Sequence, residues 1–374
     1  MAANKEMPAN MPVMSVDKFV ELLSDSYICV INNDLSPKML PSVMLWGPPG
    51  VGKSQGVRQI AKEIERGTGK RVDVTDVRLL LFNPIDLRGI PVANEDRTLA
   101  VWLKPKIFQM DSSDNVVNIL FLDEISAAPQ SVQAAAYQIT LDRIVGEHKL
   151  PDNCIVIAAG NRVTDKSVSV KMPKALANRL LHIEVSGSFE SWKKWAIGAG
   201  VNRKVLGYLS FRRDRLFGFN ATNDELAFPT PRSWEMVSNI LNTVSENVEK
   251  IYPLICGLIG VGQALEFKVW CSVFSELPDV EKIFAGRETL IPKKADVMYA
   301  LVSSMTSFAA EHKYDAIQIG NSLTYSRNLP ADFGELLIQN YLDIEKNYEK
   351  FLMTVPEYYE YSLRNAIKRN GNVE

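Results

Sequence analysis

The sequence predicts an α/β first half, built on a parallel sheet flanked by helices, and an all-helical second half. Before about residue 186, short apolar runs bounded by turn residues alternate with segments of helical periodicity, as in parallel strands buried on both faces. After residues 186–188, Ser-Gly-Ser, the periodicity is helical throughout and prolines separate the segments. The apolar runs expected to form strands are residues 43–46, 72–81, 117–122, 155–159 and 182–185.

The composition is that of a globular protein with more than one domain. The chain has 374 residues, of which 46% are hydrophobic and 23% are charged, and a chain of this length usually forms two or three domains. Its 42 Lys and Arg residues nearly balance its 44 Asp and Glu residues, so nucleic-acid binding is not indicated. The longest apolar stretch, 251–265, is too short for a membrane span, and residues 1–14 lack a signal-peptide pattern. We therefore expect a cytoplasmic protein.

The cysteines and histidines do not form a recognisable metal or disulfide pattern. No two of the four cysteines are spaced as Cys-x-x-Cys, and the three histidines do not cluster with them in the sequence. We expect reduced, mostly buried thiols rather than a zinc site or a disulfide framework. The cysteines are Cys29, Cys154, Cys256 and Cys271.

Residues 47–54, Gly-Pro-Pro-Gly-Val-Gly-Lys-Ser, match the phosphate-binding pattern G-x-x-x-x-G-K-[ST] in full. The glycines allow backbone N–H groups to converge on phosphate oxygens, and the helix expected at 53–66 points its positive N-terminal end at the anion. Lys53 is expected to contact the β and γ phosphates of ATP, and the Ser54 hydroxyl is expected to ligate Mg²⁺. The strand before the loop and the helix after it disfavour an ordinary glycine-rich turn. The residues expected to bind the nucleotide are Gly47, Pro48, Pro49, Gly50, Val51, Gly52, Lys53, Ser54 and Gln55.

A second motif is the apolar run 118–122, which ends in the carboxylates Asp123 and Glu124. A buried strand that ends in this way places both carboxylates at the C-terminal edge of the sheet, beside the phosphate loop. We expect Asp123 to belong to the Mg²⁺ shell and Glu124 to polarise the attacking water, because phosphoryl transfer needs positioning and charge neutralisation more than covalent chemistry.

Together the two motifs resemble those of AAA+ ATPases of the P-loop type. Within that superfamily the chain is most similar to the MoxR group, in the clade with an insertion in its second helix, over about residues 40–265. Residues 1–14, which contain Met, Asn and Pro, are expected to be a flexible leader. The resemblance implies an AAA+ nucleotide-binding domain at 15–187 and a helical lid at 188–280. Residues 281–374 are expected to form a helical C-terminal extension, a prediction from length and pattern alone.

The resemblance also implies roles for three further residues. Asn161, after the strand at 155–159, is similar to the sensor-1 residue that orients water near the γ-phosphate. Arg179 matches the arginine that acts as a finger on the nucleotide of the neighbouring subunit. Arg232, within Phe-Pro-Thr-Pro-Arg-Ser-Trp at 228–234, resembles the sensor-2 arginine of the lid.

The finger assignment leaves alternatives open. The MoxR segment ends in Asp-Arg-Phe, whereas this chain has Asn178 before Arg179 and Leu180 after it. Arg143 and Arg162 are the competing candidates for the finger. An arginine suits the role because its planar fork can meet two phosphoryl oxygens at once.

Two hairpins are expected, at residues 90–103 and 143–149. The first resembles the insertion of the MoxR clade, which is directed toward the central pore of the ring, and the family resemblance makes both hairpins contacts for a partner. The alternative is that Leu99, Val101 and Trp102 pack on the domain itself. His148 is expected to be an exposed hairpin residue rather than a ligand or a base, because no second histidine or acid is spaced to orient it.

The resemblance implies a Mg²⁺-dependent ATPase that forms a homo-oligomeric ring, expected to be a hexamer, and remodels a protein partner. That partner is expected to contain a von Willebrand factor A domain. Two alternatives remain at this stage: a nucleic-acid motor or helicase loader of the same superfamily, and a nucleotide-dependent scaffold with little turnover.

Overall fold

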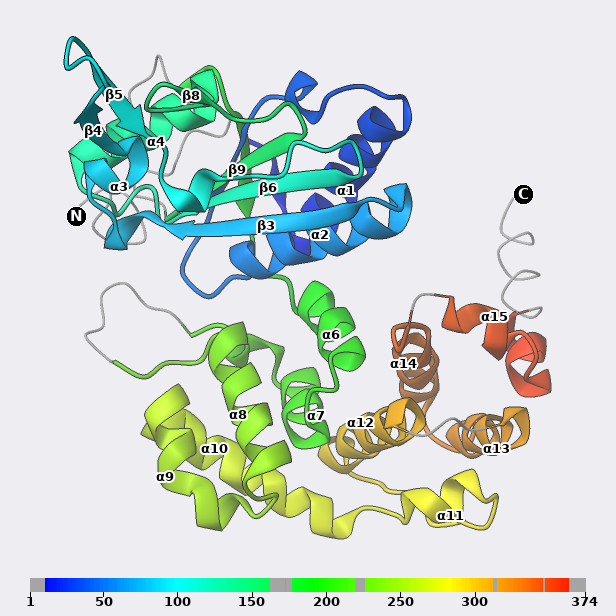
Figure 1. The fold of residues 1–374 in the computed structure, drawn as a ribbon. Coiled ribbons are helices and arrows are strands. Elements are labelled where there is room, and N and C mark those ends of the chain that lie inside the picture. The colour runs from blue at the N-terminus through cyan, green and yellow to red at the C-terminus, as the bar shows by residue number, and fades with distance from the viewer. Residues whose placement is uncertain are drawn as a thin grey trace. The chain divides into compact units, whose positions relative to one another are not determined.

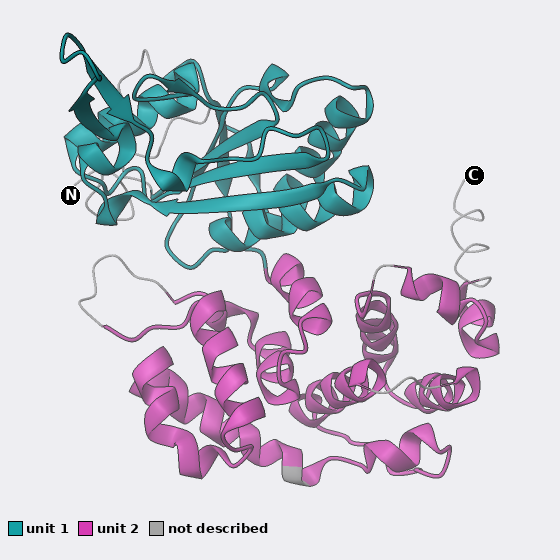
Figure 2. Ribbon diagram, in the orientation of Figure 1, with its two compact units in different colours: residues 1–188 teal, residues 189–374 magenta. Residues whose placement is uncertain are grey.

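The computed structural model describes residues 11–161, 172, 177–218, 226–311, 315–345 and 347–362. The chain forms two compact units, Met1–Ser188 and Phe189–Glu374 (Figures 1 and 2). Each unit has its own hydrophobic cores and is described separately.

The first unit is built on a parallel sheet, as predicted, and the central strands are buried on both faces. Neighbouring strands are not consecutive in the sequence, so the chain must cross over between them, and most of these connections contain a helix (Figure 1). The six strands of the described sheet, in spatial order, are β1 (Val13–Met14), β10 (Leu181–Val185), β2 (Val43–Trp46), β9 (Cys154–Gly160), β6 (Val116–Asp123) and β3 (Arg71–Arg78).

The strand predicted at 72–81 is too long. β3 ends at Arg78, and Leu79–Leu81 form a short 3-10 helix. β3 lies at the edge of the sheet, and of the three leucines only Leu79 is buried. The prediction extended the strand too far because Leu80 and Leu81 are apolar but exposed, so the apolar run does not mark the buried strand alone.

Helices cover both faces of the sheet because alternate strand residues point to opposite sides. Ile119 and Phe121 of β6 pack with the helices α1 (Val16–Asn32) and α2 (Lys53–Thr68). Leu120 and Leu122 pack with α4 (Gln130–Asp142) on the other face. Ser15 occupies the N-cap position of α1, but its hydroxyl binds the Asp17 carboxylate at 2.5 Å rather than a backbone amide.

Both predicted hairpins are present, and they contact each other. One consists of β4 (Ile90–Ala93) and β5 (Ala100–Leu103) and follows the short helix α3 (Pro84–Arg88); the other consists of β7 (Ile144–Val145) and β8 (His148–Lys149). His148 Nε2 donates to the carbonyl oxygen of Trp102 at 2.8 Å, so the expectation that His148 is exposed is wrong: it is half-buried between the hairpins.

The second unit is helical throughout its described residues, as predicted. Its first core contains Trp192, Val205, Leu206 and Leu209, and its second core surrounds Tyr341. The helices are α6 (Phe189–Gly198), α7 (Arg203–Phe211), α8 (Pro231–Thr243), α9 (Val248–Ile259), α10 (Val261–Cys271), α11 (Val280–Phe284), α12 (Ala295–Glu311), α13 (Ala316–Ser326), α14 (Ala331–Leu342) and α15 (Tyr348–Leu352).

Three details of the second unit differ from the prediction. Pro253, expected to separate two helices, lies inside α9. Its missing N–H would have bonded the carbonyl of Glu249, an exposed residue in the first turn whose carbonyl water can satisfy. The helix α13 was not predicted, and the described part of the segment predicted as one helix at 333–370 contains most of α14, all of α15 and a further helical stretch at 356–362.

The cysteines are free thiols, but only one of them is buried. Cys29 is exposed, Cys154 is buried, and Cys256 and Cys271 are half-buried. Burial raises the pKa of Cys154 to about 12, so this thiol stays protonated at neutral pH. No helix in the described part of the chain is both long and apolar enough to cross a membrane.

The base of the β4–β5 hairpin depends on Gly89, which ends α3 with a positive φ of 91°. A Cβ at this position would lie 2.0 Å from the carbonyl oxygen of Leu103 on β5. Gly69, which ends α2 with a φ of 69°, has no atom within 4 Å of such a Cβ.

We predict that Gly89→Ala lowers the free energy of unfolding by about 2 kcal/mol or more, because the clash with backbone adds to the conformational strain. Gly69→Ala, the matched control, should cost only about 1 kcal/mol, the strain of a left-handed residue. Urea denaturation of both variants measures the difference. Equal losses would contradict the close contact between Gly89 and β5.

Candidate active site

The phosphate-binding motif forms the connection between β2, in the interior of the sheet, and the N-terminus of α2. Gly52 has a φ of 108°, and a Cβ on Gly47 would lie 2.7 Å from the carbonyl oxygen of Val185 on the neighbouring strand. Other residue types would therefore strain or displace the loop. In the described structure no side chain caps the start of α2, which leaves its first N–H groups directed at the loop.

Lys53, the first residue of α2, is only 8% exposed, and three oxygen atoms hold its ammonium group at the loop. Nζ donates to the carbonyl oxygens of Gly47 at 2.6 Å and Pro48 at 3.0 Å, and to Oδ1 of Asn161 at 3.1 Å. The structure thus brings Lys53 of the phosphate loop together with Asn161, the polar residue expected after the strand β9.

The carboxylate of Asp123 is fixed on both of its oxygens. Oδ2 accepts from the Ser54 hydroxyl at 2.9 Å, and Oδ1 accepts from the backbone N–H of Glu124 at 2.9 Å. Two oxygen donors that the sequence placed in a Mg²⁺ shell are therefore neighbours.

Glu124 has a left-handed backbone, with a φ of 59°, which is uncommon for a residue other than glycine. The next residues are tied to β9: Ile125 N–H donates to Ala159 O at 3.0 Å, and Asn161 N–H donates to the Ser126 hydroxyl at 2.9 Å. Strain of this kind persists only where surrounding bonds over-determine the backbone, and it is concentrated at functional sites.

Ser126 is a residue that the sequence analysis missed. Its hydroxyl is buried and holds the backbone of Asn161, so it positions the amide that meets Lys53. Its only sequence signal is its place two residues after the paired carboxylates. Gln55, which was also expected to bind the nucleotide, is exposed in the first turn of α2.

The donor set fits a nucleotide with its metal ion. Among the described residues no three Asp, Glu, His or Cys side chains cluster to hold a metal ion alone. Mg²⁺ is commonly held by one or two protein oxygens together with substrate phosphates and water, and the adjacent Ser54 hydroxyl and Asp123 carboxylate provide such a pair.

Of the three finger candidates, Arg143 has a structural role. It ends α4 with a left-handed backbone, and its guanidinium donates to the carbonyl oxygens of Cys154 at 2.6 Å and Leu40 at 3.4 Å. Arg162 lies outside the described residues. Arg179 is exposed, in the turn that precedes β10.

Arg232 lies in the second unit, in the first turn of α8, and is exposed. The start of this helix is capped by neighbouring residues: Ser233 N–H donates to Oγ1 of Thr230 at 3.1 Å, and Thr230 N–H donates to Oγ of Ser233 at 2.7 Å. These two capping hydrogen bonds do not involve the side chain of Arg232.

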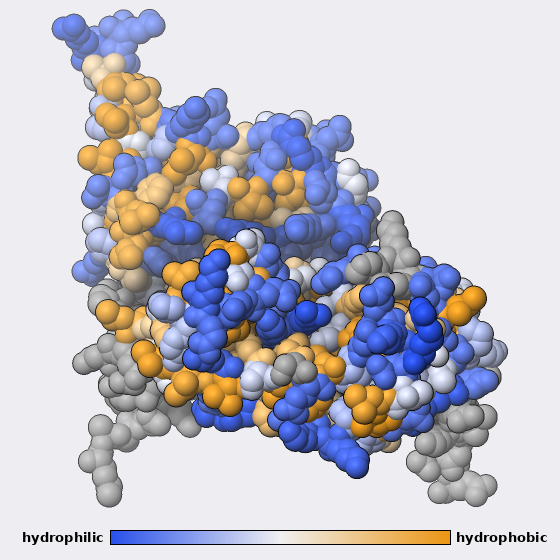
Figure 3. Space-filling model, turned by 90° about the horizontal axis from the view of Figure 1, so that it is seen from below, coloured by the Kyte–Doolittle hydropathy of each residue, from blue (hydrophilic) through white to orange (hydrophobic). Residues whose placement is uncertain are grey.

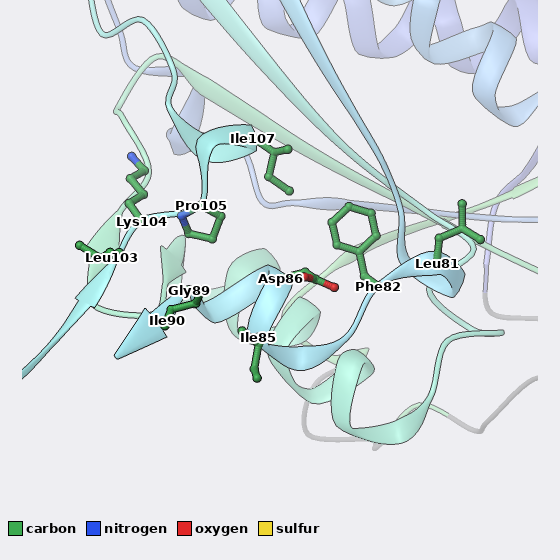
Figure 4. Close-up of a pocket in the computed structure, with 10 residues that line it drawn as sticks. All are labelled: Leu81, Phe82, Ile85, Asp86, Gly89, Ile90, Leu103, Lys104, Pro105 and Ile107. Atoms are coloured by element: carbon green, nitrogen blue, oxygen red, sulfur yellow. The ribbon is translucent and has the colours of Figure 1, made fainter. Parts of the chain in front are cut away.

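Beside the β4–β5 hairpin there is a cavity of about 440 Å³ (Figure 4). It lies between the hairpin base, α3 and the segments around Phe82 and Ile107. Leu103, which lines the cavity, is 56% exposed, and Leu99, farther along the hairpin, is 67% exposed. Apolar residues also appear among hydrophilic ones on the face in Figure 3. Leu99 and Val101 therefore do not pack on the domain, whereas Trp102 is half-buried.

Residues 43–184 match the model of the ATPase family associated with various cellular activities (AAA). The match contains the phosphate loop, the paired carboxylates and Asn161. Residues 43–184 form an AAA ATPase domain. ATP binding and hydrolysis are the activities of this domain, and the parallel sheet with its flanking helices is the corresponding P-loop fold.

No curated protein matches the sequence. Similar solved structures include a candidate ATPase from Cytophaga hutchinsonii, with 16% identity, coverage of 86% of this chain and 83% of that chain, and a TM-score of 0.32. PCH-2 of C. elegans is 11% identical, with coverage of 70% of this chain and 69% of that chain and a TM-score of 0.35. A RuvB mutant from Thermotoga maritima is 14% identical, with coverage of 87% of this chain and 90% of that chain and a TM-score of 0.34.

We predict that Arg143→Ala lowers the free energy of unfolding by about 1–3 kcal/mol, because two carbonyl oxygens lose a charged donor. ATP turnover per folded molecule should stay within about twofold of the unaltered protein. Arg66→Ala, which removes an exposed ion pair on α2, is the control and should change stability by less than about 0.5 kcal/mol. A stable Arg143→Ala protein whose turnover falls about 10³-fold would instead make Arg143 the finger.

Proposed function

We propose that the chain is a Mg²⁺-dependent ATPase of the MoxR type, which assembles into a ring and uses ATP hydrolysis to remodel a protein partner. The observation that carries this proposal is the convergence of Lys53, Ser54, Asp123 and Asn161 at the C-terminal edge of one sheet. This arrangement supplies the positioning and the charge neutralisation that phosphoryl transfer requires.

Each residue has a distinct task in this proposal. The loop amides and Lys53 bind the phosphates, while Ser54 and Asp123 would hold Mg²⁺, which would neutralise phosphate charge. Glu124 polarises the attacking water, and Asn161 orients it. The Asn161 side chain is at the site for this role, since its amide oxygen accepts a hydrogen bond from the Lys53 ammonium group.

The exposure of two arginines supports the proposed ring. Arg179 is exposed on the first unit, which suits a finger that reaches the nucleotide of a neighbouring subunit. Arg232 is exposed at the start of α8, as a lid arginine would be, and residues 188–280 would form that lid. We propose six subunits, with residues 281–374 as a helical extension.

The partner surface in this proposal is the first hairpin. Its apolar residues Leu99 and Leu103 are exposed, and the cavity at its base can receive a side chain of the partner. A protein containing a von Willebrand factor A domain is the partner we propose, and the cytoplasm is the compartment. The near balance of charges favours this over a nucleic-acid motor.

We predict that Glu124→Gln binds ATP and assembles but turns over at least about 10²-fold more slowly, because the amide cannot take a proton from water. Glu65→Gln, an exposed position on α2, is the matched control and should turn over normally. Steady-state phosphate release and nucleotide-binding titrations measure both properties. Normal turnover by Glu124→Gln would remove this residue from the mechanism.

We predict that Arg179→Ala lowers turnover on the order of 10³-fold, the typical effect of losing an arginine finger. Mixing it with Lys53→Ala subunits should restore part of the activity, because the latter donate an intact Arg179 to a competent neighbouring site. The assay is phosphate release across a series of mixing ratios. No recovery at any ratio would contradict a finger supplied by the neighbouring subunit.

A further inference from the structure

Trp46, His182 and the carbonyl of Ala177 form a continuous chain of hydrogen bonds. Trp46 Nε1 donates to Nδ1 of His182 at 2.9 Å, and Nε2 of His182 lies 2.7 Å from the carbonyl oxygen of Ala177. An indole N–H can only donate and a carbonyl can only accept, so His182 is the neutral tautomer with its proton on Nε2. The Trp46 and His182 rings are also stacked, with centroids 6.1 Å apart.

The Ala177 carbonyl belongs to the turn that carries Arg179. Leu180 N–H donates to the same oxygen at 3.2 Å, which closes a four-residue turn from Ala177 to Leu180. Arg179 is the third residue of this turn and is exposed. The imidazole of His182 therefore holds the first residue of the turn, two positions from the proposed finger.

The other end of the chain reaches the phosphate loop. Trp46 is the last residue of β2, and the next residue, Gly47, supplies a carbonyl oxygen to the Lys53 ammonium group. His182 lies on β10, the strand that pairs with β2 in parallel, with His182 opposite Met44. A single side chain thus bridges the strand that begins the phosphate loop and the turn that presents Arg179.

We propose that His182 is a positioning residue for the arginine finger: it fixes the Arg179 turn against the strand that leads into the phosphate loop of its own subunit. The proposal rests on the proposed function, in which Arg179 acts on the neighbouring subunit. What it adds to the proposed function is the side chain that orients Arg179. Its consequence is that His182 affects catalysis in the neighbouring site and leaves ATP binding in its own site intact.

Two substitutions separate the two hydrogen bonds. His182→Gln can place its amide N–H near the position of Nε2 and keep the donation to Ala177, whereas His182→Asn is too short to reach Ala177. We expect His182→Asn to lower kcat by about 10- to 100-fold with little change in the KM for ATP, because a small misplacement of a catalytic group is costly. His182→Gln should retain most of the kcat. Equal kcat for the two variants, with matching thermal stability, would overturn the proposal.

Subunit mixing tests where the defect acts. His182→Asn mixed with Lys53→Ala should recover activity, because the latter donates a correctly held Arg179. His182→Asn mixed with Arg179→Ala should not recover, because neither subunit donates an effective finger. Failure of the first mixture, or recovery in the second, would overturn the positioning role.

The same experiment separates the two levels of the account. If Arg179→Ala is rescued by Lys53→Ala but His182→Asn is not, the finger stands and the role of His182 is refuted. If neither variant is rescued, the finger itself is refuted, and the positioning role falls with it. Thermal melts of each variant before mixing ensure that only folded subunits are compared.

Discussion

The Lys53 ammonium group must keep its charge while it is almost fully buried, and most of the site serves to meet that constraint. Burying a charged group is costly unless polar atoms surround it. The carbonyl oxygens of Gly47 and Pro48 and the amide oxygen of Asn161 lie within 3.1 Å of Nζ. These oxygens come from the loop itself and from the end of β9, so the lysine is positioned only when the sheet is correctly assembled.

The strand order makes this possible. β9 lies between β2 and β6, which places Asn161 between the phosphate loop and the paired carboxylates. Bonds from Ser126 and Ile125 to the end of β9 then hold the loop that contains the strained Glu124. The ends of three strands are therefore tied to one another, as expected where catalysis depends on preorganised charges.

Much of the first unit was predictable because its signals are local. The phosphate loop, the strand at 43–46 and the run that ends at Asp123 are contiguous segments whose function and burial follow from their own residues. The edge strand was overpredicted since three consecutive leucines at 79–81 suggest burial, while only the first is buried. Pro253 was misjudged because its effect depends on which face of α9 meets solvent.

The missed or altered assignments all depend on contacts between distant segments. Ser126 and His182 gain their roles from residues that meet them only in the folded sheet. Arg143 looked like a candidate finger in the sequence, yet its guanidinium is held by the carbonyls of Cys154 and Leu40. Periodicity cannot predict such partners, because it describes which face is buried and not what lies there.

The most direct test is ATP binding and turnover by Lys53→Ala, compared with Lys62→Ala on the exposed side of the same helix. The account predicts that Lys53→Ala loses at least about 10²-fold in turnover and binds ATP more weakly, because a buried charge aimed at the phosphates is removed. Lys62→Ala should match the unaltered protein. ATP affinity and turnover that are unchanged in Lys53→Ala would contradict the account at its centre.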